Sequence, residues 1–238
     1  FEGRAVAVTM RTPGHDEELA AGFLLTEGVI ARREDIRAIK PVVAKGGGVE
    51  ANLIDVTLVR PEAVDFARRT RHVFTASSCG LCGKATIAAV QAKHAALGPD
   101  GAPPVRREIL AAMPATLAAG QATFQRTGGL NATGLFTAEG KLLVLREDVG
   151  RHNAVDKAIG HLLLAGGIAP SATVLLVSGR VAFEIVQKAL AARIGFIAAI
   201  SAPTSLAVDF ARNSGQTLVG FLRDGRMNVY AGSDRLLA

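Results

Sequence analysis

The only two cysteines of the chain, Cys79 and Cys82, lie three residues apart in a glycine-rich stretch. Such a pair can be half of a tetrahedral zinc site, a reversible dithiol, or a thiolate that carries a group. A structural zinc needs four ligands, and the sequence has no second pair of this kind. Helix-forming residues follow, so we expect Cys82 near a helix N-terminus, where partial positive charge and Lys84 favour a thiolate. The pattern therefore favours a reactive sulfur over two half-buried thiols in a loop.

Length and composition predict a globular α/β protein. A chain of 238 residues, 49% of them hydrophobic, can bury a core without disulfides, as one large domain or as a main domain with a smaller lobe. Scarce cysteines fit a reducing cytoplasm, and no apolar run approaches the roughly 18 residues of a membrane span. No signal peptide is visible, but the chain begins inside an apparent strand, so we expect that its natural N-terminus is missing.

A net charge of +6 and a sequence pI near 9.8 indicate an anionic ligand or an acidic partner. Nucleic acid is not favoured, because the chain has no tryptophan and one tyrosine and its arginine pairs are scattered.

Strand and helix patterns alternate along the chain. Expected strands are 6–10, 51–60, 130–136, 142–145, 174–177, 196–200, 218–222 and 227–230; expected helices are 16–26, one stopped by Gly98 and Pro99, a short one from Arg107 restarted by Pro114, 153–164, 182–193 and 205–212. This order predicts a largely parallel or mixed sheet with helices on both faces. We expect a smaller N-terminal α+β lobe with the cysteine loop over 1–98 and an α/β cofactor-binding region over 99–238, which could form one continuous domain.

Polar residues cluster where expected strands end and helices begin, in the segments 147–153, 178–180 and 201–205. Ligands of open α/β sheets bind at the carboxyl ends of strands, and helix starts with arginines hold phosphates well. Each segment alone could be an ordinary helix cap. Three segments with two arginines favour an anion pocket. Its candidate residues are Asp148, Arg151, His152, Asn153, Ser178, Gly179, Arg180, Ser201, Thr204 and Ser205.

Four segments carry a resemblance to a known family: 77–84, 146–157, 177–180 and 201–205. With them, nearly the whole chain from 11–18 to 228–230 is similar to the FdhD family of sulfur carriers required for formate dehydrogenase activity. The resemblance implies a cytoplasmic homodimer with the three-layer fold of cytidine deaminases. It also implies that sulfur arrives from a cysteine desulfurase as a cysteine persulfide. The sulfur then passes to the molybdenum or tungsten bis(molybdopterin guanine dinucleotide) cofactor, for which GDP would be a mimic, before the cofactor enters formate dehydrogenase.

By position, the resemblance assigns the persulfide to Cys79 and makes Cys82 its partner. The cofactor-binding stretch of the family falls on Phe221, Leu222, Arg223, Asp224, Gly225 and Arg226. One departure is Asn131, which stands where family members usually carry histidine. Since sulfur on Cys79 must reach the metal end of the cofactor, we expect the cysteine loop and the pocket on the same face.

Two other functions remain open at this point. A zinc-dependent nucleoside or nucleobase deaminase would use His15 and Glu17 with Cys79 and Cys82, since His-x-Glu and Cys-x-x-Cys at helix starts are the parts of such sites. Against this hypothesis, Ser78 stands where proline is usual. A chaperone that only delivers the cofactor would keep the pocket without needing the thiols.

Overall fold

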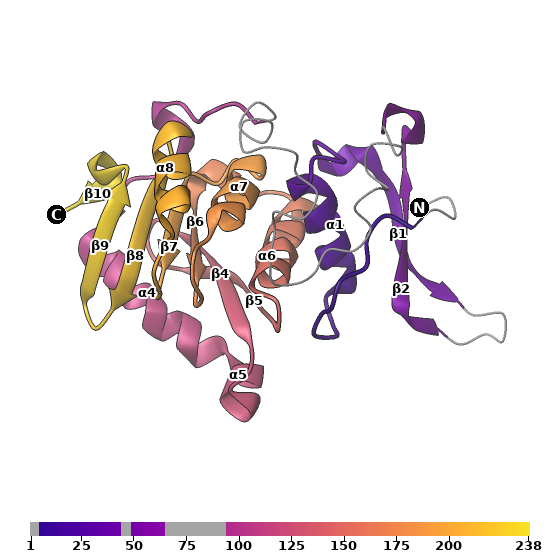
Figure 1. The fold of residues 1–238 in the computed structure, drawn as a ribbon, viewed down its shortest axis with the longest axis horizontal. Helices are drawn as coiled ribbons and strands as arrows, with labels where there is room; N and C mark the ends of the chain where they lie inside the picture. The colour runs from indigo at the N-terminus through magenta and orange to yellow at the C-terminus, as the bar shows by residue number, and fades with distance from the viewer. Residues whose placement is uncertain (1–4, 44–48, 65–93) are drawn as a thin grey trace.

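The computed structural model describes residues 5–43, 49–64 and 94–238. Their largest unit is a six-stranded sheet in the order β5-β4-β6-β7-β8-β9 (Figure 1). Its strands are β4 (Asn131–Thr137), β5 (Leu142–Asp148), β6 (Thr173–Val177), β7 (Phe196–Ala199), β8 (Thr217–Arg223) and β9 (Arg226–Ala231). Only the β6–β7 and β7–β8 pairs are parallel. The sheet is thus mixed rather than largely parallel, because the short turns after β4 and β8 can join only antiparallel neighbours.

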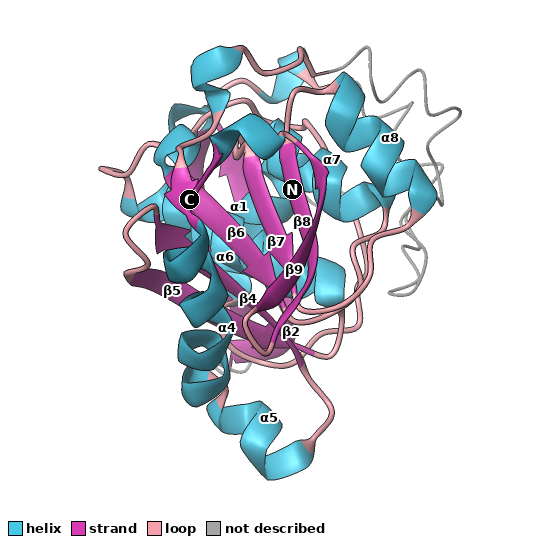
Figure 2. Ribbon diagram, turned by 90° about the vertical axis from the view of Figure 1, so that its left-hand side faces the viewer, coloured by secondary structure: helices cyan, strands magenta, loops and turns pink. Residues whose placement is uncertain are grey.

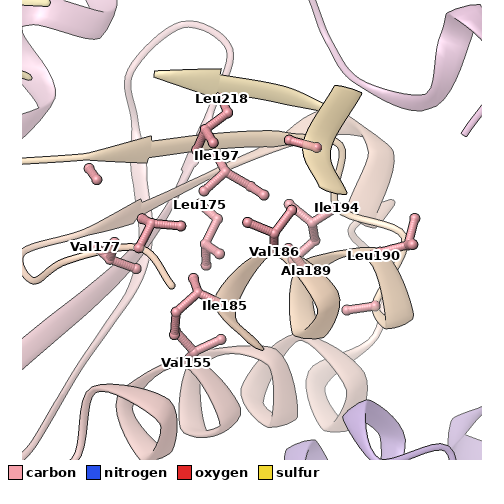
Figure 3. Packing of buried hydrophobic residues seen from close by; sticks show 14 of the residues in the cluster. Val155, Leu175, Val177, Ile185, Val186, Ala189, Leu190, Ile194, Ile197 and Leu218 are labelled. Carbon is pink, nitrogen blue, oxygen red and sulfur yellow. The ribbon is translucent and has the colours of Figure 1, made fainter. Parts of the chain in front are cut away.

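Helices cover both faces of this sheet. Val174 and Leu176 of β6 pack in the core cluster that contains α4 (Arg107–Gly120), whereas Leu175 and Val177 pack in the opposite cluster. This division follows from the alternation of side chains along a strand. The opposite cluster contains α6 (Arg151–Ala165), α7 (Phe183–Ala191) and α8 (Ser205–Asn213), and Figure 3 shows part of its packing. The result is a three-layer α/β arrangement; its likeness to cytidine deaminases stays a prediction.

Helix α4 corrects one expectation, because it runs without a break through Pro114. An interior proline removes a backbone hydrogen bond and costs a helix about 3 kcal/mol. Leu110, Met113 and Leu117 are almost fully buried against the sheet, and this burial offsets the loss. A short helix, α5 (Ala122–Thr127), follows and projects beyond the sheet (Figures 1 and 2).

The N-terminal elements are α1 (Asp16–Thr26), with the bounds predicted, and an antiparallel pair, β1 (Ile36–Val43) and β2 (Val49–Leu58). Helix α1 packs on α6 (Figure 1), and the two backbones meet at Gly22 and Gly160. A Cβ built at either glycine would lie 1.8 Å from a carbonyl oxygen of the other helix. The division near residue 98 stays a prediction.

The expected strand at 6–10 is wrong. Only Val8 makes an isolated β-bridge in this stretch, and the backbone of Met10 and Thr12 instead bonds to side chains near the start of α6. The short elements are β3 (Val105–Arg106), which pairs with β10 (Leu236–Leu237), and 3₁₀ turns at Arg33–Asp35, Pro61–Ala63, Pro99–Gly101, Pro170–Ala172 and Ser233–Arg235. No helix in the described part of the chain is long and apolar enough to cross a bilayer.

Strand direction decides which loops meet. Strand β4 runs antiparallel to both β5 and β6, so β5, β6, β7 and β8 all point the same way. Their carboxyl ends share one edge of the sheet, which we call the carboxyl edge, and the opposite side is the amino edge. Helices α6 and α7 begin at the carboxyl edge, directly after the loops that follow β5 and β6.

Candidate functional site

The carboxyl edge brings together the three predicted polar segments and the turn after β8. The backbones of Ser178 and Ala132 are hydrogen-bonded, and Val181 N–H donates to the carbonyl of Ala202 at 3.1 Å. Phe221 N–H donates to the carbonyl of Ser201, also at 3.1 Å. These bonds join the loop after β6 to the loop after β7, and that loop to the end of β8, so the segments lie together at the carboxyl ends of the strands, as the sequence predicts.

Two hydroxyl groups of the predicted pocket accept hydrogen bonds from the backbone of the protein itself. Thr204 Oγ1 accepts from Ala207 N–H at 3.2 Å and so caps α8. Ser178 Oγ accepts from Ala132 N–H at 2.9 Å, which ties the end of β6 to the start of β4. Thr204 is therefore an ordinary helix cap, which is one of the two interpretations that the sequence allows.

Asp148 is fully buried and has several internal partners. Its carboxylate lies 2.7 Å from Lys157 Nζ and accepts from the backbone N–H groups of Thr12 and Gly150 and from Asn153 Nδ2. Lys157 Nζ also donates to Thr12 O, and Asn153 Nδ2 to Met10 O. Asp148 and Asn153 thus fasten residues 9–12, which we call the N-terminal strap, to the start of α6.

Two further motif residues, Arg146 and Glu147, are also engaged inside the protein. Arg146 donates to Glu18 of α1, which also contacts His161 Nδ1 at 3.0 Å. Burial raises the pKa of Glu18, but hydrogen bonds from Arg146 and His161 outweigh it, so the pKa lies below its ordinary value. The carboxylate of Glu147 accepts from the N–H groups of Thr123 and Phe124 at the start of α5.

A buried ion pair joins α6 to α7. Lys188 Nζ lies 2.8 Å from Asp156 Oδ2 and donates to Thr26 Oγ1 at 2.9 Å. Burial lowers the pKa of Lys188, but the charges of Asp156 and Glu27 outweigh it, so the pKa lies above its ordinary value and the ammonium stays charged. This pair holds the end of α1 in place.

Among the described residues, arginines are the cations at the carboxyl edge that lack an acidic partner. Arg180, Arg223 and Arg226 are exposed, and none of them makes an ion pair with another described residue. The Arg223 guanidinium lies 6.0 Å from the centre of the Phe221 ring. Arg151 Nε is buried without a hydrogen-bond partner in the described ranges. Together with the N-termini of α6 and α7, these groups make an edge suited to an anion.

The end of β8 and its turn into β9 have an unusual backbone. Phe221, near the end of β8, and Asp224, in the turn, have φ angles of 52° and 53°, a region that residues other than glycine rarely adopt. The Asp224-Gly225 pair signals a turn in the sequence, but no sequence signal reveals the conformation of Phe221. Strain of this kind is common at ligand sites.

Asn131 lies at the start of β4, beside these loops. Its Nδ2 donates to Val149 O at 3.0 Å, and its Oδ1 lies 2.9 Å from a Cβ built on Gly179. Glu184, in the first turn of α7, is a buried group at this edge that the sequence pattern does not reveal, since an acid at this position is typical of a first helical turn.

Cys79 and Cys82 lie outside the described residues. The nearest described positions, Val64 and His94, line a cavity of about 440 Å³ with Ala191 and Arg193, where α7 ends at the amino edge. Cys79 is fifteen residues from each of them, and such a length of chain can span up to roughly 50 Å. That the cysteines share a face with the pocket stays a prediction.

Of the four residues in the deaminase hypothesis, the structure describes His15 and Glu17. Glu17 is exposed, and His15 Nδ1 lies 3.5 Å from Glu18 Oε2. Burial and the nearby Arg146 charge hold the pKa of His15 below its ordinary value. The two cysteines of that hypothesis are among the undescribed positions.

Comparisons with known proteins agree on one family. A model of the FdhD/NarQ family matches residues 1–237. The Sulfur carrier protein FdhD of Streptomyces avermitilis is 51% identical over 242 residues, covering 99% of this chain and 85% of that protein. The Saccharolobus solfataricus protein of the same name is 44% identical over 230 residues, with coverage of 97% and 83%.

One solved structure extends the match to the fold. The crystal structure of a protein from Desulfotalea psychrophila, described as a formate dehydrogenase accessory protein, superimposes with a TM-score of 0.71 at 26% identity. The match covers 98% of this chain and 87% of that one. On this agreement of sequence and structure, the chain belongs to the FdhD/NarQ family.

Proposed function

We propose that this protein is a sulfur carrier that accepts sulfur from a cysteine desulfurase and passes it to the bis(molybdopterin guanine dinucleotide) cofactor of a formate dehydrogenase. The observation that carries the proposal is family membership over residues 1–237 in a chain whose only cysteines are Cys79 and Cys82. The relatives named Sulfur carrier protein FdhD and the related accessory protein support it.

In the proposed sulfur step, the thiolate of Cys79 attacks the outer sulfur of the desulfurase persulfide. The sulfur–sulfur bond of the donor breaks, a new one forms on Cys79, and the desulfurase cysteine leaves as a thiolate. Atoms and electrons balance without an oxidant, because one persulfide replaces another. Cys82 is the partner thiol in this proposal.

The cofactor, as the substrate of the second step, carries guanine nucleotide ends with pyrophosphates. The basic carboxyl edge supports binding of such an anion through Arg151, Arg180 and the Phe221–Arg226 turn. Backbone N–H groups at the starts of α6 and α7 would add to these contacts. Two copies of the chain would supply two such edges for the two ends of one cofactor, so we include a homodimer in the proposal.

Mass spectrometry after incubation with a cysteine desulfurase and cysteine tests the sulfur step. The wild-type protein should gain about 32 Da, the mass of one sulfur atom. Cys79→Ala should lose this adduct and cofactor sulfuration, with Cys82→Ala as the matched variant. A full adduct and full activity in Cys79→Ala would overturn the assignment, and a carrier that needs neither thiol would be the delivery chaperone instead.

Calorimetry with GDP tests the anion site. Charge-assisted contacts contribute about 1.5–3 kcal/mol, so Arg180→Ala should weaken GDP binding roughly ten-fold or more. Arg107→Ala, at the exposed arginine that opens α4, is the matched control and should bind as wild type. Absence of GDP binding by the wild type, or equal binding by Arg180→Ala, would refute this part. Sedimentation showing a monomer that still sulfurates the cofactor would refute the dimer.

A further inference from the structure

The first turns of α6 and α7 place an imidazole and a carboxylate together at the carboxyl edge. His152 Nε2 lies 4.0 Å from Glu184 Oε2, and the two side chains are only 12% and 7% exposed. This separation is too long for a hydrogen bond but short enough for strong attraction between charges. Glu184 Oε2 is buried and accepts no hydrogen bond from any described residue.

The His152–Glu184 pair is the first of two charged side-chain pairs between α6 and α7, which run parallel. His152 and Asp156 are four residues apart on α6, and Glu184 and Lys188 are four residues apart on α7, so each pair lies on one helix face. In the second pair, Lys188 Nζ donates hydrogen bonds to the carboxylate of Asp156. Glu184 therefore has His152, rather than Lys188, as the ionisable partner that the structure places beside it.

The helix start alone would disfavour a cation at His152, because the first turn of a helix carries partial positive charge. A buried carboxylate within 4–6 Å has the opposite effect and favours the imidazolium. Among the described residues, Glu184 is the acid that lies beside His152 and favours a cation there. Arg151 and Arg180 at the same edge oppose a cation at His152, whereas Asp148 with Lys157 and Asp156 with Lys188 offset each other.

We propose that Glu184 is a positioning residue that holds His152 in its protonated form toward an anion at the carboxyl edge. The inference rests on the proposed function for the presence of that anion. Arg151 Cβ lies 4.0 Å from a Cβ built on Gly179, so the start of α6 adjoins the 178–180 loop, which is a predicted part of the same site. Anion binding at this edge then depends on pH through the His152–Glu184 pair.

The first measurement needs no ligand. The imidazole Cε1–H resonance of His152, assigned by its absence in His152→Gln, is followed by NMR against pH. Glu184→Gln should move the midpoint of this titration down by roughly one pH unit or more. Glu184→Asp keeps the charge and should restore much of the shift. Glu108→Gln is the matched control, since Glu108 is also the second residue of its helix but is exposed.

The second measurement is GDP affinity against pH by calorimetry. A phosphate monoester titrates near pH 6, so the comparison is made between variants with the same ligand. Wild-type affinity should fall about ten-fold as His152 loses its proton. In Glu184→Gln this fall should come at lower pH, and in His152→Gln it should disappear.

The outcomes separate the two proposals. An unchanged NMR midpoint in Glu184→Gln would overturn this inference whatever GDP does. A shifted midpoint with the same pH dependence of GDP binding in wild type, Glu184→Gln and His152→Gln would overturn the link to the anion. No GDP binding by the wild type at any pH would overturn the proposed site, and with it the role of Glu184 in binding, while leaving the sulfur step to its own test.

Discussion

Asp148 provides a sharp test of whether the carboxyl-edge motif binds ligand or holds the chain together. Asp148→Asn keeps the size of the side chain but removes the charge that faces Lys157, which is 1% exposed. The variant leaves a buried ammonium without its counter-charge and directs an amide at the donors of Thr12, Gly150 and Asn153.

Breaking one side of a buried pair costs about 3–5 kcal/mol, and we expect a loss of this size in the free energy of unfolding. For a chain of this length, that corresponds to a fall of roughly 6 to 20 °C in melting temperature. Lys157→Met on the Asp148→Asn background should recover part of the loss, because no uncompensated charge remains.

Urea unfolding measures the loss, and amide hydrogen exchange at Thr12 reports whether the N-terminal strap is released. Asp209→Asn, at an exposed acid of α8, should change the free energy of unfolding by less than about 0.5 kcal/mol. If Asp148→Asn folds with unchanged stability but loses GDP binding, Asp148 is a ligand contact and does not hold the N-terminal strap.

Two further predictions concern the contact between α1 and α6. Gly160→Ala places a Cβ against the backbone carbonyl of Glu18, which no side-chain rotation relieves, so it should cost about 1–3 kcal/mol of unfolding free energy in urea. Gly98→Ala, where a Cβ meets open space, is its control, and equal stability of the two variants would contradict the close contact. Because the pKa of Glu18 is lowered in the folded protein, its contribution is complete above about pH 4.5 and is lost as pH falls through the folded pKa. Glu18→Gln should therefore lose less stability than wild type between pH 5 and pH 3, and parallel curves would show that Glu18 gains nothing from Arg146 and His161.

Much of the local structure follows from the sequence. Helix α1 has its predicted bounds, and the strands β4 to β9 lie within a few residues of the predicted ones, because periodicity and turn residues act over short distances. The order of strands and helices also indicated that the segments after β5, β6 and β7 would share an edge, which the structure confirms. Local pattern failed where long-range packing decides, as in α4, which continues through Pro114.

The segment 146–157 shows what the sequence could not decide. Its polar residues suggest a ligand site, since no local requirement explains so many of them in order. In the structure, Arg146, Asp148 and Asp156 instead contact Glu18, Thr12 and Thr26, each more than 100 residues away in the chain. A buried charge requires a partner, but that partner need not be nearby in sequence. Only the tertiary structure therefore shows which polar residues stabilise the fold through internal contacts. By the same reasoning, the position of Glu184 beside His152 exists only because α6 and α7 run parallel on one face of the sheet.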